Sequence, residues 1–439
     1  MSPGKAAGTN ESAATASAAH LVCGGCGLLC DDLAGTSDTG CAAADAWFGI
    51  PAQPAATTVD GQPATIDAAV NAAAHRLTNA RRVLLTGLTS VPLEPVRLAC
   101  QIAERLTAAV DAGTADTALL TGPTITRVGE VTAAFEELRD RADLVIFWGC
   151  NPAASHPRFL ERFVQPARPT GGRQTMSVGP QQVVPPTAHH SHLSLAADQI
   201  VPAARLLQAS LEGHGITPTD DPLAATISKL NAAVDAASCI GIVTSTRDDP
   251  SGLTAWSLGQ LVRALAHRKP AFQIPLGAGT AGGGGNAAGF AASCSWRYGA
   301  PGAIAAADRD GSEFQPAEAD AVRLISRGEV DCVLAVGRLA PPIEAALTAA
   351  AVAPSVIRIT DITPEPAAVT TVMLGTASLA RATTGTMLRE DGRLMQLQPL
   401  MAPKKPTVDQ LLIKLKQAID AIRPTASTLQ PAAFSGESS

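Results

Sequence analysis

The sequence predicts an α/β protein with parallel sheets flanked by helices. Short apolar runs begin near residues 82, 142, 238 and 330, and each ends at a turn followed by helical apolar spacing. Continuous apolar strands that alternate with helices are typical of parallel strands buried on both faces of a sheet. The chain of 439 residues is long enough for roughly two or three domains.

Composition narrows the class of protein further. Apolar residues make up 46% and charged residues 16%, and the net charge of −6 offers no basic surface for nucleic acid. No apolar window of about 18 residues suggests a membrane span. The 9 cysteines do not read as a secreted disulfide framework, which indicates a reducing compartment. We therefore expect a cytoplasmic protein that binds neither nucleic acid nor membrane.

The elements follow in order along the chain. Residues 1–19 are rich in Ala, Ser and Thr without a secretory pattern, which predicts a disordered arm. Apolar spacing predicts helices over 65–78 and 92–106, with a strand beginning at 82 between them. A last amphipathic helix is expected over 406–422, and 423–439 is predicted to be a disordered tail.

A cysteine motif near the start carries the first candidate chemistry: Cys23, Cys26, Cys30 and Cys41. Thiolates two and three residues apart on a glycine-bearing turn can reach three corners of a 4Fe–4S cluster, and a later cysteine can supply the fourth. Four thiolates also suit zinc. Cysteines left over from an ancestral site are the third alternative, and all three stay open.

The loop after the strand near 142 is the second candidate site. Asn151, His156 and Arg158 lie on it, and ligands bind beyond the carboxyl ends of parallel strands. These side chains suit a phosphate or a pterin-like heterocycle, although an Asn-Pro turn with a structural histidine explains them too. A third group, His189, His190 and His192, lacks nearby acidic partners, so surface histidines are favoured over a metal site.

Taken in order, these motifs resemble the B subunit of formylmethanofuran dehydrogenase, a short relative of molybdopterin oxidoreductases such as formate dehydrogenase. The resemblance covers nearly the whole chain. It is carried by Cys-x-x-Cys-x-x-x-Cys-Asp-Asp from Cys23, Gly129-Glu130, Trp148-Gly-Cys-Asn-Pro with His156-Pro-Arg158, Asn286 with Gly289-Phe290, Cys294-Ser-Trp296, and Gly385-Thr386 with Arg389 and Gly392.

The resemblance implies a molybdopterin-oxidoreductase-like fold with formate dehydrogenase domains I–III and no C-terminal barrel domain. A cysteine-motif domain would comprise residues 20–60 and about 370–402. An α/β domain would comprise 61–115 and about 265–369, with a second α/β domain, 116–264, inserted in it. A C-terminal helix would follow at 403–422.

Family residues near the pterin would correspond here to Asn151, His156, Arg158, Asn286, Thr386 and Arg389. The departures from the family pattern are as informative as the matches. The family's metal-ligating cysteine position is Leu120, which cannot ligate tungsten or molybdenum. Its Asp-Pro-Arg string reads Gly179-Pro180-Gln181, and its His-Tyr-Asn string reads Gly284-Gly285-Asn286. The resemblance therefore implies a vestigial pterin region without a catalytic residue or a tungsten/molybdopterin cofactor.

This pattern resembles the B subunit of the formyltransferase/hydrolase complex of methylotrophic bacteria. That complex converts formyl-tetrahydromethanopterin through formylmethanofuran to formate. The implied role is a non-catalytic structural subunit whose partners are the A (hydrolase), C (scaffold) and D (formyltransferase) subunits and a methanofuran-type carrier. The alternative is the catalytic B subunit of a tungsten or molybdenum formylmethanofuran dehydrogenase.

Overall fold

The computed structural model describes residues 21–33, 35–49, 53–113, 127–168, 171–180, 182, 189–215, 222–245, 252–277, 279, 283–308, 311–364 and 370–423. The predicted arm (1–19), all of the predicted tail beyond Arg423, and the Leu120 position lie outside these residues.

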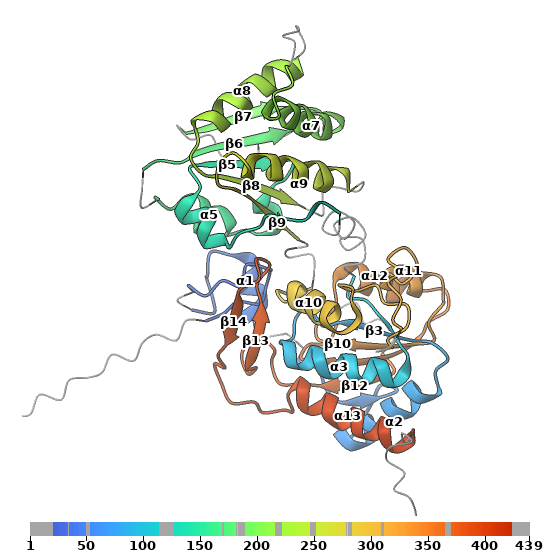
Figure 1. The fold of residues 1–439 in the computed structure, drawn as a ribbon. Helices are drawn as coiled ribbons and strands as arrows, with labels where there is room; N and C mark the ends of the chain where they lie inside the picture. Colours follow the sequence, from blue (N-terminus) through green and yellow to red (C-terminus); the bar gives the residue numbers. More distant parts are fainter. Residues whose placement is uncertain are drawn as a thin grey trace, which may run out of the picture.

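A seven-stranded sheet forms the larger part of the molecule (Figure 1). Its strands run in the order β2-β1-β12-β11-β10-β3-β4, parallel from β12 to β4, with β1 and β2 antiparallel at one edge. The strands are β1 (Thr58–Val59), β2 (Gln62–Pro63), β3 (Val83–Gly87), β4 (Ala109–Val110), β10 (Cys332–Val336), β11 (Ser355–Thr360) and β12 (Val372–Gly375).

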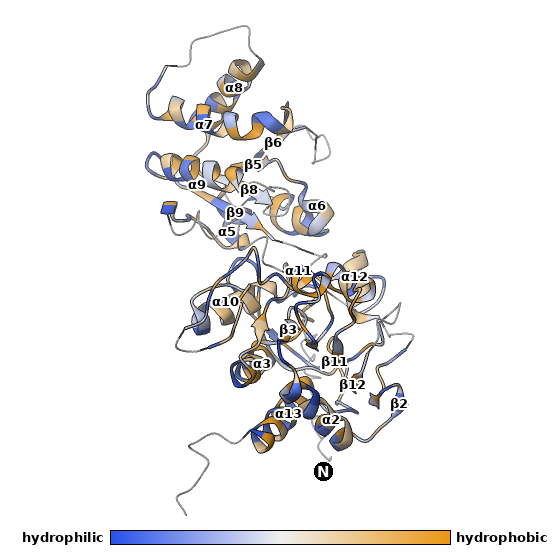
Figure 2. Ribbon diagram, turned by 90° about the vertical axis from the view of Figure 1, so that its right-hand side faces the viewer, coloured by the Kyte–Doolittle hydropathy of each residue, from blue (hydrophilic) through white to orange (hydrophobic). Residues whose placement is uncertain are grey.

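Helices cover both faces of this sheet. Alternate residues of β3 and β10 point into two separate apolar clusters, because successive side chains of a strand face opposite sides. One cluster lies under α2 (Ile66–Asn79), α3 (Leu93–Leu106) and α13 (Val408–Ile422), and the other under α11 (Ala321–Ser326) and α12 (Pro341–Ala349). Figure 2 shows apolar and polar stretches alternating along α3 and α13, as expected for helices with one buried face.

A five-stranded parallel sheet forms a second unit, in the order β7-β6-β5-β8-β9. Its strands are β5 (Leu144–Trp148), β6 (Gln174–Gly179), β7 (His190–Ser194), β8 (Ile240–Ser245) and β9 (Ala271–Leu276). One face packs on α7 (Ile200–Leu211), which follows the short helix η2 (Ala197–Gln199), and on α8 (Pro222–Ala236) and α9 (Leu253–Ala266). The other face packs on α5 (Phe135–Arg141) and a π-helical turn, η1 (Leu160–Val164), while α6 (Pro152–Ser155) follows β5.

We call the described residues within 127–276 the small lobe and the other described residues the main lobe. Between the two sheets lies a third part of the main lobe (Figure 1). It contains the cysteine segment, α1 (Ala42–Phe48), α10 (Ala287–Tyr298) and a two-stranded ribbon of β13 (Gly385–Leu388) and β14 (Leu394–Leu397). This part contributes the contacts between the lobes.

The predicted fold class, parallel sheets flanked by helices without a barrel, is confirmed in the described part of the chain. Two strands fall beyond the expected domain boundaries. β9 (Ala271–Leu276) was expected in the larger α/β domain but pairs with β8, and β12 (Val372–Gly375) was expected with the cysteine motif but pairs with β11. An apolar run predicts a buried parallel strand, but the same run fits either sheet. None of the described helices is long and apolar enough to cross a membrane.

Candidate functional site

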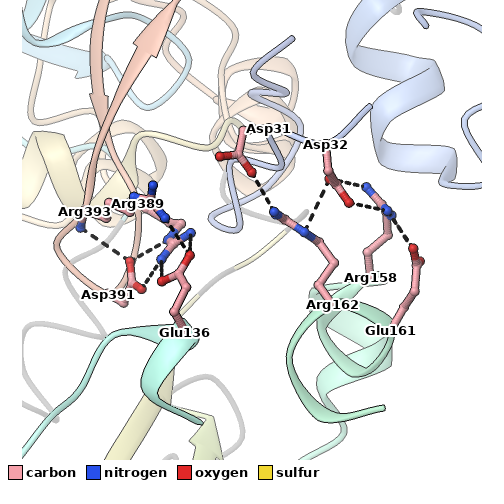
Figure 3. A network of polar contacts seen from close by, with 9 residues as sticks. All are labelled: Asp31, Asp32, Glu136, Arg158, Glu161, Arg162, Arg389, Asp391 and Arg393. Atoms are coloured by element: carbon pink, nitrogen blue, oxygen red, sulfur yellow. Dashed lines mark hydrogen bonds and ion pairs between the residues drawn. The ribbon is translucent and has the colours of Figure 1, made fainter. Parts of the chain in front are cut away.

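Three of the six predicted pterin-region residues lie where the small lobe joins the main lobe: His156, Arg158 and Arg389. A fourth, Asn286, lies within the main lobe beside the ribbon. Each is at least nine-tenths buried. Figure 3 shows the charged part of this junction, in which arginines of one lobe face carboxylates of the other. The side chains lie here because the loop after β5 in the small lobe and the start of α5 face the cysteine segment and the turn of the β13–β14 ribbon.

Arg389 occupies the ribbon turn and is fully buried. Its guanidinium donates to Glu136 on α5 (Nη1–Oε1, 2.9 Å) and to Asp391 (Nε–Oδ1, 2.7 Å), and lies 5.0 Å from the ring centroid of Phe135. Asp391 in turn accepts from the Phe135 amide at 2.8 Å. Burial alone would raise the pKa of Glu136, but Arg389 and Arg393 outweigh it and lower that pKa to about 2. The ribbon turn is thus tied to the start of α5 by charge and by aromatic contact.

Arg158 and Arg162 form a second contact, with the cysteine segment. Arg158 donates to both carboxylate oxygens of Asp32 at 2.8 and 2.9 Å and also pairs with Glu161. Arg162 donates to Asp31 at 2.6 Å. Although burial opposes it, the pKa of Asp32 is lowered by these guanidinium groups. The acidic pair after Cys30 therefore holds the small lobe rather than an external ligand.

His156 is enclosed between two side chains. Its Nδ1 lies 2.8 Å from Ser155 Oγ, and its Nε2 lies 2.9 Å from Glu390 Oε2. Burial would raise the pKa of Glu390, but His156 and the amides of Gly277 and Gly279 lower it. This carboxylate is therefore ionised at neutral pH. His156 is thus a fully buried histidine whose Nε2 faces a carboxylate but makes no hydrogen bond of standard geometry.

The remaining predicted residues have structural partners as well. Asn286 donates from Nδ2 to the Val91 carbonyl at 2.7 Å and accepts from the Leu388 amide at 2.8 Å. Asn151 is exposed and accepts from the Ala153 amide at the start of α6. Thr386 lies on the outer face of the ribbon, where its hydroxyl donates to the side chain of Gln396. Neither Asn151 nor Thr386 joins the buried group.

Backbone fills the position of the family's His-Tyr-Asn string. The Gly285 amide donates to the Gly24 carbonyl at 2.8 Å, and a Cβ on Gly285 would lie 2.5 Å from Leu29 Cδ2. A Cβ on Gly284 would lie 2.5 Å from the Thr89 carbonyl oxygen. Only glycine permits so close an approach, so the cysteine segment packs where the family has larger side chains.

A cavity of about 250 Å³ remains beside the ribbon turn. Its lining includes Glu130, Phe135, Ile274, Glu390 and Asp391. Ligand pockets commonly measure about 300–1,000 Å³ and combine an apolar wall with a few free polar groups. Here Glu390 and Asp391 are already paired with His156 and Arg389, so this space offers little for binding a large anionic cofactor.

The four cysteines are buried at 4–5% exposure and pack against Leu28, Leu29 and Trp47. Burial raises the pKa of Cys23 to about 12 and also raises the pKa values of Cys26 and Cys30. Among the described residues, no group of three or more His, Cys, Asp or Glu side chains is placed to hold a metal ion. In this arrangement the four thiols pack among apolar side chains of the core.

The three histidines at β7 also have ordinary partners. His190 Nδ1 lies 2.9 Å from Thr175 Oγ1, and His192 Nδ1 lies 2.8 Å from Ser177 Oγ. His189 is exposed. These contacts agree with the structural alternative for these residues rather than with a metal site.

Sequence reasoning missed the acidic partners of the buried arginines: Glu136, Glu390, Asp391 and Asp31. Two signals were available. Arg158 and Arg162 are four residues apart and so share one helical face, and Asp31-Asp32 is an acidic pair that needs a basic neighbour once it is half-buried. Neither signal says which distant segment supplies the partner.

Known proteins were compared with the chain in three ways. No model of a known protein family matches the sequence. The B subunit of the tungsten-containing formylmethanofuran dehydrogenase 2 of Methanococcus maripaludis is 27% identical over 224 residues, which is 45% of this chain and 51% of the relative. The same subunit of Methanocaldococcus jannaschii is 28% identical over 165 residues, 33% of this chain and 37% of the relative. The chain thus matches about half the length, or less, of these curated relatives.

A solved structure matches most of the chain. A chain of the formyltransferase/hydrolase complex FhcABCD from Methylorubrum extorquens, determined with methylofuran, aligns with a TM-score of 0.70 and 22% identity. The alignment covers 83% of this chain and 99% of that one. The two chains share a fold. The resemblance that the motifs predicted, to the B subunit of the dehydrogenase and to the formyltransferase/hydrolase complex, is confirmed.

Proposed function

We propose that this protein is a non-catalytic structural subunit of a formyltransferase/hydrolase complex. That complex would convert formyl-tetrahydromethanopterin through formylmethanofuran to formate. The fold shared with a chain of FhcABCD over 83% of this protein supports the proposal, as does the similarity to the B subunit of the dehydrogenase.

The observation that carries the proposal is the use of the charged side chains in the expected pterin region. Arg389 and Arg158 form ion pairs with Glu136 and Asp32, and His156 Nε2 lies 2.9 Å from Glu390, so these side chains join the two lobes. A dinucleotide cofactor would have to displace these pairs. Leaving Glu390 and Asp391 buried and without these partners would be costly.

The sequence at the other family positions supports the same conclusion. Leu120 replaces the metal-ligating cysteine, and the Gly284-Gly285 position is occupied by close backbone packing. We therefore propose that the chain binds no tungsten or molybdopterin. A 4Fe–4S cluster at the cysteine motif would require the four thiols to rearrange.

The proposed partners are the A, C and D subunits of the same complex, together with a methanofuran-type carrier. We place the complex in the cytoplasm. The subunit would position the A and C subunits, while hydrolysis and formyl transfer would take place on other chains.

Elemental analysis of the purified complex tests this proposal. We expect molybdenum and tungsten far below one atom per chain. Stoichiometric tungsten or molybdenum would instead establish the catalytic dehydrogenase alternative. Iron near four atoms per chain would show that the cysteine motif binds a cluster, and zinc near one atom per chain would show that it binds zinc.

A substitution supplies a second test. In the complex, Leu120→Cys should leave the rate of formyl transfer unchanged, because no chemistry is proposed at that position. A loss of transfer, in a variant that still assembles, would show that this region acts in the reaction.

A further inference from the structure

Two buried thiols lie together where α3 packs against α10: Cys100 and Cys294. Each has an exposure of 0%. On α10, Phe290, Cys294 and Tyr298 are spaced four residues apart, so they share one helical face. The Tyr298 hydroxyl donates to the Cys100 carbonyl at 3.1 Å, and the two thiols share a hydrogen bond. The helix interface therefore holds a pair of cysteines in contact, separate from the cysteine motif.

The surroundings favour the loss of a proton from one member of this pair. The hydrogen bond from Cys294 lowers the pKa of Cys100, against the effect of burial, and Tyr298 and Arg297 lower it further. The same hydrogen bond, together with burial, raises the pKa of Cys294. Cys100 is thus the better thiolate, and Cys294 keeps its proton. A cysteine of lowered pKa beside a second cysteine that can resolve it is the arrangement of redox-sensing thiols.

A cavity of about 420 Å³ extends from the surface to this pair. Cys100 is part of its wall, with Arg97, Arg297 and Trp296, and Trp296 is 75% exposed. Both arginines are ion-paired with glutamates, so they offer little to an anionic ligand. A neutral molecule of the size of hydrogen peroxide fits in this space. Since Cys100 is 0% exposed, the final approach to its sulfur requires a local opening of the cavity wall.

We propose that Cys100 and Cys294 are a redox-sensitive site at which a peroxide closes a reversible disulfide. Disulfides in reducing compartments are usually transient and catalytic or redox-sensing. The S–S bond length is about 2 Å, so only thiols already in contact can be joined without moving the backbone. The disulfide would form independently of the proposed function, because neither cysteine belongs to the contacts between the lobes.

The reaction consumes one peroxide and releases two waters. The Cys100 thiolate attacks one peroxide oxygen, the O–O bond breaks, and hydroxide leaves and takes up the proton that Cys100 had lost. The Cys294 sulfur then attacks the sulfur of the resulting sulfenic acid, the S–O bond breaks, and the leaving hydroxide takes the Cys294 proton. The two sulfurs together lose two electrons, and these electrons reduce the peroxide.

The disulfide would fasten α10 to α3. Asn286, at the start of α10, bonds to the Val91 carbonyl and to the Leu388 amide, so this helix already links the main sheet with the ribbon. A cross-link between residues far apart in the sequence restricts the unfolded chain. The oxidised protein should therefore unfold at a higher urea concentration than the reduced protein, and dithiothreitol should abolish the difference.

Peptide mass spectrometry tests the cross-link. The full chain is treated with hydrogen peroxide, its free thiols are blocked with N-ethylmaleimide in denaturant, and it is digested without reduction. We expect a disulfide-linked pair of peptides containing Cys100 and Cys294, which disappears when dithiothreitol is added before blocking. Maleimide on both residues, under conditions that oxidise other thiols of the chain, would overturn the proposal. Disulfides confined to the cysteine motif would overturn it too.

Substitutions separate the roles of the two thiols. Cys294→Ser removes the resolving thiol, so dimedone should trap at least about tenfold more sulfenic acid at Cys100 than in wild type. Cys100→Ser should remove both the linked peptides and the shift in urea concentration. Cys332→Ser is the matched control, since Cys332 is 1% exposed and bonds to Ser355 rather than to another cysteine. This control should form the linked peptides as wild type does.

Two further outcomes would contradict the proposal. Equal trapping at Cys100 in wild type and in Cys294→Ser would show that the two thiols do not react with each other. Linked peptides found only in covalent dimers would assign the bond to two different chains. Urea denaturation of the reduced variants checks that they fold, and the peptide analysis of wild type decides the question if a variant does not.

Discussion

Two of the contacts that join the lobes, one at the ribbon turn and one at the cysteine segment, differ in how completely they are buried. In the ribbon-turn contact, Arg389 and Asp391 have side-chain exposures of 0% and 1%, and Glu136 has 25%. In the cysteine-segment contact, Arg158 is 10% exposed, but Asp32 and Glu161 are 42% and 58% exposed. Water can therefore replace a lost partner in the second contact but not in the first. The same residue types should contribute unequally to stability.

Removing the buried arginine is expected to have the largest effect. Arg389→Ala leaves the buried Asp391 without its cation, leaves Glu136 with only the half-exposed Arg393, and opens a gap under Phe135, so the free energy of unfolding should fall by about 3–5 kcal/mol. Urea denaturation measures this change. Arg393→Ala removes a half-exposed cation from the same Glu136 and should cost at most about 1 kcal/mol. Equal losses in the two variants would contradict the burial argument.

Crowding the point where both contacts meet should have the next largest effect. Gly27, on the cysteine segment, has its carbonyl bonded to the Glu390 amide, and a Cβ there would lie 2.1 Å from Glu390 Oε1. Gly27→Ala should therefore lower the free energy of unfolding by about 1–3 kcal/mol. Gly40→Ala, with nothing within 4 Å of its Cβ, controls for the loss of glycine, although its positive φ adds a small strain. If both variants unfold at the same denaturant concentration, Gly27 is not packed as described.

Removing the arginine of the half-exposed contact should lower the free energy of unfolding by less. Arg158→Ala removes the pairs with Asp32 and Glu161, and we expect a loss of about 1–2 kcal/mol, since both carboxylates regain water. Salt separates the two contacts further, because exposed charges are screened more strongly. The difference between wild type and Arg158→Ala should shrink when sodium chloride is raised, while that of Arg389→Ala should not. A common salt response would remove the distinction between them.

Lowering the pH is expected to give the smallest difference in stability between wild type and a variant, and the one most specific to a single residue. The folded pKa of Glu136 is about 2, below its ordinary value of 4.5, because Arg389 and Arg393 outweigh its burial. A lowered folded pKa contributes stability that is complete above the ordinary value and is lost as pH falls toward the folded one. Between those values, the stability of wild type should therefore fall more steeply than that of Glu136→Gln. Parallel curves of unfolding free energy against pH would show that Glu136 is not paired.

The sequence predicts the strands and helices well but not their neighbours. The runs at 82, 142, 238 and 330 all form buried parallel strands, and the expected helix at 406–422 is present as α13. The domain boundary that the resemblance implied, at about residue 265, separates β9 from β8, with which it pairs, and the pairing of a buried strand depends on contacts far along the chain. Periodicity reports burial, and it carries no information about which sheet buries the strand.

At the candidate site too, the sequence identifies residues but not their partners. His156, Arg158 and Arg389 were identified from the sequence, and the structure places all three where the lobes meet. The structural role of these side chains could not be predicted, because Glu136 becomes a partner of Arg389 only when the ribbon turn lies against α5. An arginine expected to bind a cofactor and an arginine that joins two lobes look alike in a sequence. The carboxylate that faces it decides between them.

The ribbon turn also has a consequence for the order in which the protein folds. Arg389 bonds to Glu136, a residue 253 positions earlier in the chain. During synthesis the small lobe emerges long before its closing contact exists, so Phe135 and Phe163 stay uncovered until the ribbon is made. A nascent chain paused before the ribbon would present this aromatic surface to chaperones, and completion of the ribbon would withdraw it.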